Sequence, residues 1–215
     1  MAGEIFVAIR SGDTARIAKL IADDPAVARE RNASGVSAIM QARYQGRQAI
    51  VDLLRPAVGE LDVFEAAALG DIARLDTLLN SDSELAQAYS GDGFTGLHLA
   101  SYFAQADAAR SLLRAGADPN AVATNGTKLA VINSAAASGS TELVTIILEA
   151  GANPNWQQDG GYTALHAAAQ RKNLQMIKAL LEAGADPAIR TNEGKTAADV
   201  GGPEVAALLK NPIRA

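Results

Sequence analysis

Apolar residues recur along this chain as short pairs, separated by stretches in which polar residues, glycine and proline gather. Ile177, Leu180 and Leu181 follow the spacing i, i+3, i+4, which is typical of one face of an α-helix. Similar pairs occur seven times, as Leu20-Ile21, Leu53-Leu54, Leu78-Leu79, Leu112-Leu113, Ile147-Leu148, Leu180-Leu181 and Leu208-Leu209. The pattern predicts a series of short amphipathic helices.

A glycine stands just past three of these predicted helices. The three segments are Gly116-Ala117-Asp118-Pro119-Asn120, Gly151-Ala152-Asn153-Pro154-Asn155 and Gly184-Ala185-Asp186-Pro187. Glycine is favoured there because the residue after a helix often adopts a left-handed conformation, and the proline three residues later blocks continuation. The three segments follow one another at a nearly constant interval, so the chain is an internal repeat.

A second motif precedes the first helix of each repeat. It is Gly93-Phe94-Thr95-Gly96-Leu97-His98, then Gly161-Tyr162-Thr163-Ala164-Leu165-His166, then Gly194-Lys195-Thr196-Ala197-Ala198-Asp199, with a weaker copy from Gly35 to Met40. Thr95 and Thr163 suit an N-cap, because a hydroxyl accepts hydrogen bonds from backbone N–H groups of the first turn. Each unit is predicted to be a helix, a tight turn, a second helix and an extended loop.

These motifs resemble the ankyrin repeat, most strongly over roughly residues 90–200. The resemblance implies an all-α solenoid of about seven helix-turn-helix units with short β-hairpin-like finger loops. We expect a single domain, residues 1–215. Its units are expected near residues 3–36, 37–60, 61–94, 95–129, 130–162, 163–195 and 196–210.

Some units depart from the repeat. The step from Ser37 to Leu61 is clearly shorter than the others, which leaves no room for a finger, and Pro56 is expected to end its helix early. The segment Gly12–Arg16 aligns with Gly70–Arg74, and Ser37 aligns with Thr95 at the same offset, which indicates a duplicated two-unit block. The first unit is expected to act as the polar-faced cap that such arrays need.

The fifth unit allows two registers. Thr127 could open a first helix that is one turn longer, or an extended finger could precede a helix that opens at Ala130. Asn133 would replace the histidine of the motif in the second case. Drift of a tolerant loop is the simplest explanation for the extra length.

Composition narrows the class of protein. Apolar residues make up 48% of the 215 residues and aromatic residues only 4%, which favours many thin layers of Ala, Leu, Ile and Val. The chain has no cysteine, so disulfides and thiolate sites are excluded and a reducing compartment, the cytoplasm, is expected. A net charge of −5 with scattered arginines argues against nucleic-acid binding, and no apolar run approaches a membrane span. We expect a monomer without cofactor or metal. The alanine-rich composition and the short loops are typical of a bacterial or engineered protein.

No catalytic motif is present. His98 and His166, the two histidines, lie two units apart, and stacked units would hold them too far from each other to share a metal ion. The resemblance implies that they make capping hydrogen bonds between neighbouring units. The glycine pairs near Gly91 and Gly160 do not open a strand–loop–helix unit with a lysine, so they are interpreted as finger turns.

The few aromatic residues are the candidates for function. Phe6 and Phe64 occupy the histidine-equivalent position of their units and are expected to fill packing space, and Phe94 and Tyr162 stand between the loop glycine and the threonine. The resemblance implies that first helices and fingers line a concave groove. The predicted partner-binding residues are Tyr44, Tyr102 and Phe103 late in first helices, Tyr89 and Trp156 in fingers, and Arg43 and Arg171 beside them. Arg43, Gln45 and Arg171 are interpreted as corresponding first-helix positions, and some of the rings could instead pack between neighbouring fingers.

A non-enzymatic module that binds a protein partner through this groove is the favoured function. A regulatory or inhibitory subunit of a co-produced enzyme is the main alternative. A small-molecule or catalytic groove between Arg43 and Arg171 is a remote alternative, because the sequence offers no cluster of titratable groups for it.

Overall fold

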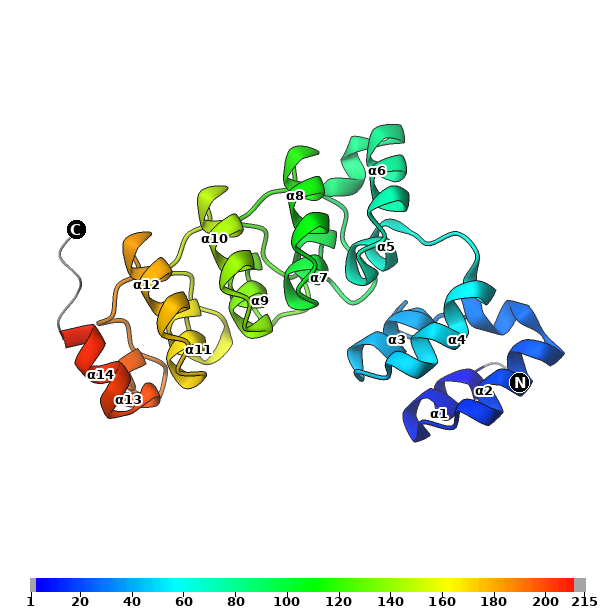
Figure 1. Ribbon diagram of the computed structural model, residues 1–215, viewed down its shortest axis with the longest axis horizontal. Helices are drawn as coiled ribbons and strands as arrows, with labels where there is room; N and C mark the ends of the chain where they lie inside the picture. The colour runs from blue at the N-terminus through cyan, green and yellow to red at the C-terminus, as the bar shows by residue number, and fades with distance from the viewer. Residues whose placement is uncertain (1–2, 211–215) are drawn as a thin grey trace.

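The computed structural model describes residues 3–210 and consists of short helices stacked into an elongated array (Figure 1). The α-helices are α1 (Glu4–Ser11), α2 (Thr14–Asp23), α3 (Ala38–Tyr44), α4 (Gln48–Val58), α5 (Val63–Leu69), α6 (Ile72–Ser81), α7 (Gly96–Tyr102), α8 (Ala106–Arg114), α9 (Val131–Ser138), α10 (Thr141–Glu149), α11 (Ala164–Gln170), α12 (Leu174–Glu182), α13 (Ala197–Gly201) and α14 (Pro203–Lys210). Three 3₁₀ turns are η1 (Pro25–Arg29), η2 (Ser83–Ala86) and η3 (Asp159–Gly161). The first two and last five residues of the predicted domain lie outside the described part.

The helices form seven consecutive pairs. The first helix of each pair packs against the first helices of its neighbours, from α1 to α13. Within residues 3–210 no β-strand forms, and the only β pairing is the isolated bridges Arg31–Ser37, Tyr89–Thr95 and Val122–Ala130. Each bridge closes a loop before α3, α7 or α9, as predicted for hairpin-like fingers.

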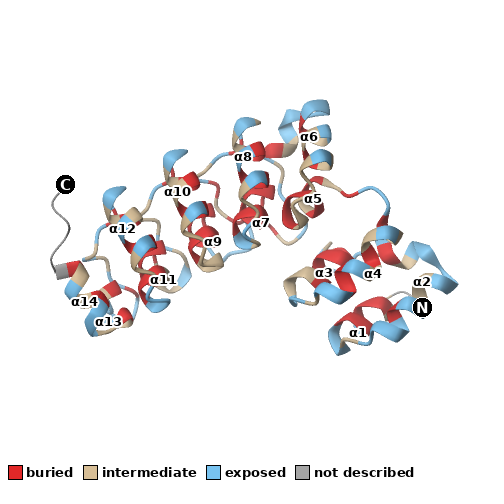
Figure 2. Cartoon of the chain, in the orientation of Figure 1, coloured by how far each residue is buried: buried red, intermediate tan, exposed pale blue. Residues whose placement is uncertain are grey.

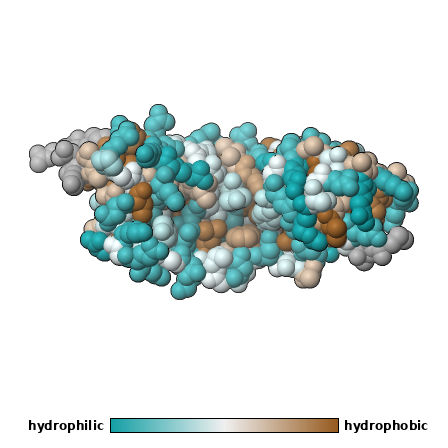
Figure 3. Space-filling view, turned by 90° about the horizontal axis from the view of Figure 1, so that it is seen from below, coloured by the Kyte–Doolittle hydropathy of each residue, from teal (hydrophilic) through white to brown (hydrophobic). Residues whose placement is uncertain are grey.

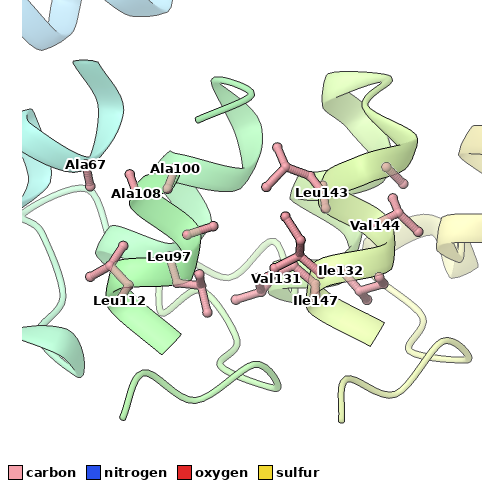
Figure 4. Close-up of a cluster of buried hydrophobic side chains, with 14 of the residues drawn as sticks. Ala67, Leu97, Ala100, Ala108, Leu112, Val131, Ile132, Leu143, Val144 and Ile147 are labelled. Atoms are coloured by element: carbon pink, nitrogen blue, oxygen red, sulfur yellow. The ribbon is translucent and has the colours of Figure 1, made fainter. Parts of the chain in front are cut away.

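The core is a row of thin aliphatic layers, one between each pair of helices and the next. Buried residues occur in every helix pair along the array, while exposed residues lie on its outer turns and loops (Figure 2). In the middle of the array, Leu97 and Leu112 of one pair lie beside Val131, Ile132 and Ile147 of the next (Figure 4). Alanines such as Ala67, Ala100 and Ala108 fill the remaining space and allow close approach of the helices. The core is therefore built from aliphatic side chains, as the composition predicts.

Capping residues determine where the first helices begin. The Thr95 hydroxyl accepts from the His98 N–H, and the His98 ring accepts from the Thr95 N–H. In the fifth pair Ala130 occupies the N-cap, and its N–H donates to Oδ1 of Asn133 at 3.2 Å. Of the two registers that the sequence allows, the structure has the extended finger with a helix that opens at Ala130.

The duplication of the two-unit block is also visible in the backbone. Asp13 and Asp71 cap α2 and α6 through the same hydrogen bond, and Asp24 and Asp82 cap η1 and η2 in the same extended conformation. The same offset relates Tyr44, the last residue of α3, to Tyr102, the last residue of α7. Equivalent positions in the two blocks can therefore be compared directly.

The junction between α4 and α5 interrupts the regular stack. Only residues 59–62 connect the two helices, so no finger forms there, as predicted from the short step. Elsewhere in this part of the array the second helices of neighbouring pairs pack on each other, as α2 does on α4 and α6 does on α8. Helices α4 and α6 do not pack closely, and α6 lies apart from α4 (Figure 1). The prediction that Pro56 ends its helix is wrong: α4 continues to Val58 and ends at Gly59, which has a φ of 73°. Burial of Val58 holds the last turn in place despite the missing N–H of the proline.

In the first six helix pairs, the turn that follows the first helix of the pair contains a residue in the left-handed conformation. Gly46 fills this position after α3 with a φ of 65°, and Ala104 fills the equivalent position after α7 with a φ of 59°. This conformation costs an L-residue with a side chain about 1–2 kcal/mol. We expect Ala104→Gly to raise the free energy of unfolding by about 1 kcal/mol, because glycine adopts the left-handed conformation without this cost. We expect Gly46→Ala to lower the free energy of unfolding by a similar amount. A Cβ at Gly46 meets no atom within 4 Å, so this change reports the conformational cost without a steric clash. Urea unfolding of both variants measures this, and a stabilising effect of Gly46→Ala would contradict it.

Candidate partner-binding site

Aromatic side chains gather where α3 and α7 end. The ring centroids of Tyr44 and Phe103 are 5.5 Å apart, and those of Tyr102 and Phe103 are 5.1 Å apart in an edge-to-face arrangement. The guanidinium of Arg43 lies 4.8 Å from the Phe103 centroid, within the range of a cation–π interaction. Phe64 and Phe94 pack against the same group of residues, next to Met40 and Leu99. We call Tyr44, Phe64, Phe94, Tyr102 and Phe103 the aromatic cluster.

Tyr44 is held in place by a carboxylate of a finger. Its hydroxyl donates to Oδ2 of Asp92 at 2.8 Å, while the Ser90 hydroxyl donates to Oδ1 of the same carboxylate. Burial, followed by the charge of Asp92, raises the pKa of Tyr44 above its ordinary value. The phenol therefore remains a hydrogen-bond donor, and the hydrogen bond to Asp92 holds the ring in place.

The missing finger brings two other fingers together. Because no finger precedes α5, the loop before α3 contacts the loop before α7 directly: a Cβ at Gly91 would lie only 2.7 Å from the Ser34 carbonyl oxygen. A hollow of about 190 Å³ lies beside this contact. Its charged side chains are Arg31, Asp62, Glu65 and Asp92, and Arg31 pairs with Asp62 at 2.7 Å. We call this the finger hollow.

A second hollow, of about 270 Å³, lies between α7 and α9. Its apolar and aromatic lining is Tyr44, Phe94, Leu99, Tyr102 and Leu129, and His98 and Ser134 complete it. Tyr102 is 47% exposed, one of the few large apolar residues of the described chain with that much contact with solvent. We call this the apolar hollow.

A third hollow, of about 210 Å³, lies one step further along, between α9 and α11. It is lined by Asn133, Ala137, Gln158, Tyr162, Thr163, Ala167, Gln170 and Arg171. Most of these side chains are polar, and arginine is the only charged residue among them. We call this the polar hollow.

The three hollows lie on the side of the array formed by first helices and the loops that precede them, which we call the first-helix face. Seen from below Figure 1, apolar atoms occur on the surface as separate patches divided by polar areas (Figure 3). The apolar surface seen from this side is therefore localised rather than one continuous strip.

Tyr89 and Trp156 lie outside these hollows or at their margin and bind the finger that precedes α9. The Tyr89 hydroxyl donates to the Val122 carbonyl at 3.1 Å, and the Trp156 indole N–H donates to the Lys128 carbonyl at 2.7 Å. Trp156 is half-buried against the main core, whereas Tyr89 is 42% exposed and also borders the finger hollow. The geometry thus favours packing between fingers for both rings, which is the alternative that the sequence left open.

The structure corrects two assignments of equivalent positions. Arg171 is the C-cap of α11 and corresponds to Gln45 and Phe103, whereas Arg43 lies two positions earlier within α3. The two arginines therefore do not occupy corresponding positions. Arg171 donates to the Ala137 carbonyl of the preceding pair, while Arg43 donates to the Ala68 carbonyl of the following one.

The second correction concerns α5. This helix begins with Asp62 as N-cap and Glu65 at its third position, and these two residues form a reciprocal capping box. Glu65 is buried and takes the capping role that His98 has in α7, so Phe64 does not fill that role. Phe64 instead joins the aromatic cluster, while Phe6 is buried in the main core.

The two histidines connect neighbouring pairs. Nε2 of His98 donates to the Leu129 carbonyl at 3.1 Å and Nε2 of His166 to the Lys195 carbonyl at 3.1 Å, while each Nδ1 accepts from its capping threonine. Burial lowers the pKa of His98 to about 4 and also lowers the pKa of His166. Both rings are neutral structural links at neutral pH.

Residues 3–210 contain neither a metal-binding cluster nor a membrane-spanning helix. No group of three or more His, Asp or Glu side chains is arranged to hold a metal ion. Over the same residues, no helix has both the length and the apolar character needed to cross a membrane.

Sequence reasoning missed the residues that complete the hollows. Leu99, Leu129, Gln158 and Gln170 were not identified as candidates, because each is an ordinary residue for its position. The offset between the duplicated blocks, however, places tyrosine at the same position of α3 and α7, and this repetition could have singled out the ends of both helices.

Comparisons with known proteins agree with this architecture. A model of the ankyrin repeat matches residues 92–124, and a model of ankyrin repeats in many copies matches residues 147–200. The interval between them contains the extended finger before α9. The chain is also 37% identical over 112 residues to a protein of Oryza sativa subsp. japonica named "Probable E3 ubiquitin-protein ligase XBOS31". That similarity covers 51% of this chain and only 25% of the rice protein, so the chain spans about a quarter of the relative's length. The chain therefore contains ankyrin repeats and folds as an all-α ankyrin-repeat array of about seven helix pairs.

Proposed function

We propose that this chain is a non-enzymatic protein-interaction module that binds a protein partner through its first-helix face. The single observation that carries the proposal is the exposed ring of Tyr102 above the apolar hollow, beside aromatic residues that are already fixed. Ankyrin repeats generally serve as interaction modules, and only such repeats are matched in this chain. Rigid aromatic side chains supply large contact area at low entropic cost, which is typical of binding hot spots.

The residues assigned to the interface fall into two groups. Tyr44, Tyr102, Phe103 and Arg43 would form the contact centre at the apolar hollow, and Arg171 would contribute at the polar hollow. Tyr89 and Trp156 would support the surface by holding the finger between the two hollows. We also propose that the chain acts as one domain, as a monomer in the cytoplasm, and that its alanine-rich composition reflects a bacterial origin.

The test is comparative affinity capture from lysate of the native host, with the whole chain as bait. We expect Tyr102→Ala to reduce recovery of the bound protein about tenfold, since removal of a hot-spot aromatic costs more than about 1 kcal/mol. Arg110→Ala serves as the matched control, because Arg110 lies on α8 of the same helix pair and pairs with Glu142 away from the hollows. Equal recovery with wild type and both variants, all with unchanged thermal unfolding, would contradict the proposed interface.

A further inference from the structure

The apolar and polar hollows follow one another along the array. The first lies between α7 and α9 and the second between α9 and α11, so their centres are one helix-to-helix step apart. Packed helices are separated by about 8–10 Å, and an extended chain advances about 3.3 Å per residue. A single extended segment that enters both hollows therefore spans about three residues between them.

The two hollows differ in chemistry. Aromatic and aliphatic groups dominate the first, which suits one large apolar side chain. The second has amides from Gln158 and Gln170 and the exposed guanidinium of Arg171. One guanidinium N–H group of Arg171 is used by the Ala137 carbonyl, and an arginine has five such donors in all. No carboxylate lines this hollow, and the adjacent Asp159 instead accepts from the Gly160 N–H at 3.0 Å. The polar hollow therefore complements a negative charge.

An independent feature of the backbone points to the same place. Among residues 3–210, three non-glycine residues have a positive φ: Ala104 at 59°, Lys128 at 52° and Lys172 at 54°. Ala104 follows Phe103 of the aromatic cluster, Lys128 precedes Leu129 of the apolar hollow, and Lys172 follows Arg171 of the polar hollow. A side chain in this conformation is strained where glycine would not be, and such strain is concentrated at functional sites. Two exposed lysines thus stand beside the hollows in a conformation that a glycine would adopt at lower cost.

We propose that the first-helix face recognises an extended protein segment with a large apolar residue and, about three positions away, an aspartate or glutamate. The apolar side chain enters the apolar hollow next to Tyr102. The carboxylate binds Arg171, and the exposed Lys172, which follows Arg171 in the chain, adds positive charge. This inference rests on the proposed function and adds the chemistry of the partner to it.

The first experiment uses a phage-displayed library of random 12-residue peptides, selected on the whole immobilised chain. We expect enrichment of peptides in which a large apolar residue and an acidic residue are separated by two to four positions. For a synthetic peptide of the enriched sequence, we expect Arg171→Glu to weaken binding at least tenfold. Replacing the acidic residue of that peptide with lysine should restore binding to Arg171→Glu and abolish it for the wild type. Lys178→Glu is the matched control, because it makes the same charge change on an exposed residue of α12 in the same helix pair.

A second variant separates recognition from folding. We expect Lys172→Gly to raise the melting temperature by a few degrees, since glycine relieves the left-handed strain, and to weaken binding of the acidic peptide. If Lys172 had only a structural role, Lys172→Gly would change the melting temperature and leave binding of the acidic peptide unchanged.

The outcomes distinguish this inference from the proposed function. Peptides that depend on Tyr102 but show no acidic preference, or that bind Arg171→Glu as well as the wild type, would overturn the inference and leave the protein-binding function intact. Enrichment of basic residues, or of no sequence class at all, would also overturn the inference.

Discussion

Lowering the pH from 7 to 5 is expected to reduce the free energy of unfolding by about 2 kcal/mol through His98 alone. Its pKa is about 4 in the folded protein, against 6.5 for an ordinary histidine, because burial disfavours the charged ring. The unfolded chain therefore binds a proton that the folded chain does not. The stabilising contribution is complete above pH 6.5 and is lost as the pH falls from 6.5 towards 4. A protonated Nδ1 could also no longer accept from Thr95, so protonation of the buried ring would break this capping contact as well.

The comparison that isolates His98 is with His98→Asn. Asn133 already performs the same N-terminal capping in α9, so an asparagine fits this role without titrating. We expect His98→Asn to be less stable at pH 7, because it loses the link to the Leu129 carbonyl, and to lose about 2 kcal/mol less than the wild type on acidification. Urea unfolding of both proteins at pH 7 and pH 5 measures the difference. Identical pH dependence in the two proteins would show that His98 titrates normally in the folded state.

Replacement of Tyr44 by alanine is expected to lower the free energy of unfolding by about 3 kcal/mol. The change removes a half-buried ring that packs against Phe103 and the group around Met40 and Leu99. It also removes the hydrogen bond to Asp92, which fastens α3 to the finger before α7. Tyr44→Phe keeps the ring and is expected to cost about 1–2 kcal/mol, in the range of a partly exposed hydrogen bond to a charged group.

Tyr102→Phe is the matched control for this second prediction. Tyr102 occupies the position equivalent to Tyr44 in the second of the duplicated blocks, and its hydroxyl forms no hydrogen bond within residues 3–210. We expect the free energy of unfolding of Tyr102→Phe to stay within about 0.5 kcal/mol of that of the wild type. A double-mutant cycle of Tyr44→Phe with Asp92→Ala should give a coupling energy of about 1 kcal/mol or more. Additive effects in that cycle would mean that the hydrogen bond does not fasten the finger.

Most of the repeat architecture could be predicted from the sequence because its determinants are local. Helix-period apolar residues, capping threonines such as Thr95 and Thr163, and left-handed glycines such as Gly116 each act within a few residues. The short step after Ser37 also predicted the missing finger correctly. The error about α4 arose where tertiary packing outweighs local preference, since burial of Val58 carries the helix past Pro56. The error about α5 concerns a local signal: Asp62 and Glu65 form a capping box that places Glu65, and not Phe64, at the third position of the helix.

The candidate site depends on contacts between residues far apart in the chain, which periodicity does not reveal. The sequence by itself determined the helix pairs, the fingers and the scarcity of aromatic residues. Only the tertiary structure decided which of those aromatic residues gather: omission of one finger brings Gly35 against Gly91, and this contact lets Tyr44 reach Asp92, 48 positions later. Side-chain identity sets local conformation, but the relative positions of the rings follow from how successive pairs stack across the irregular junction.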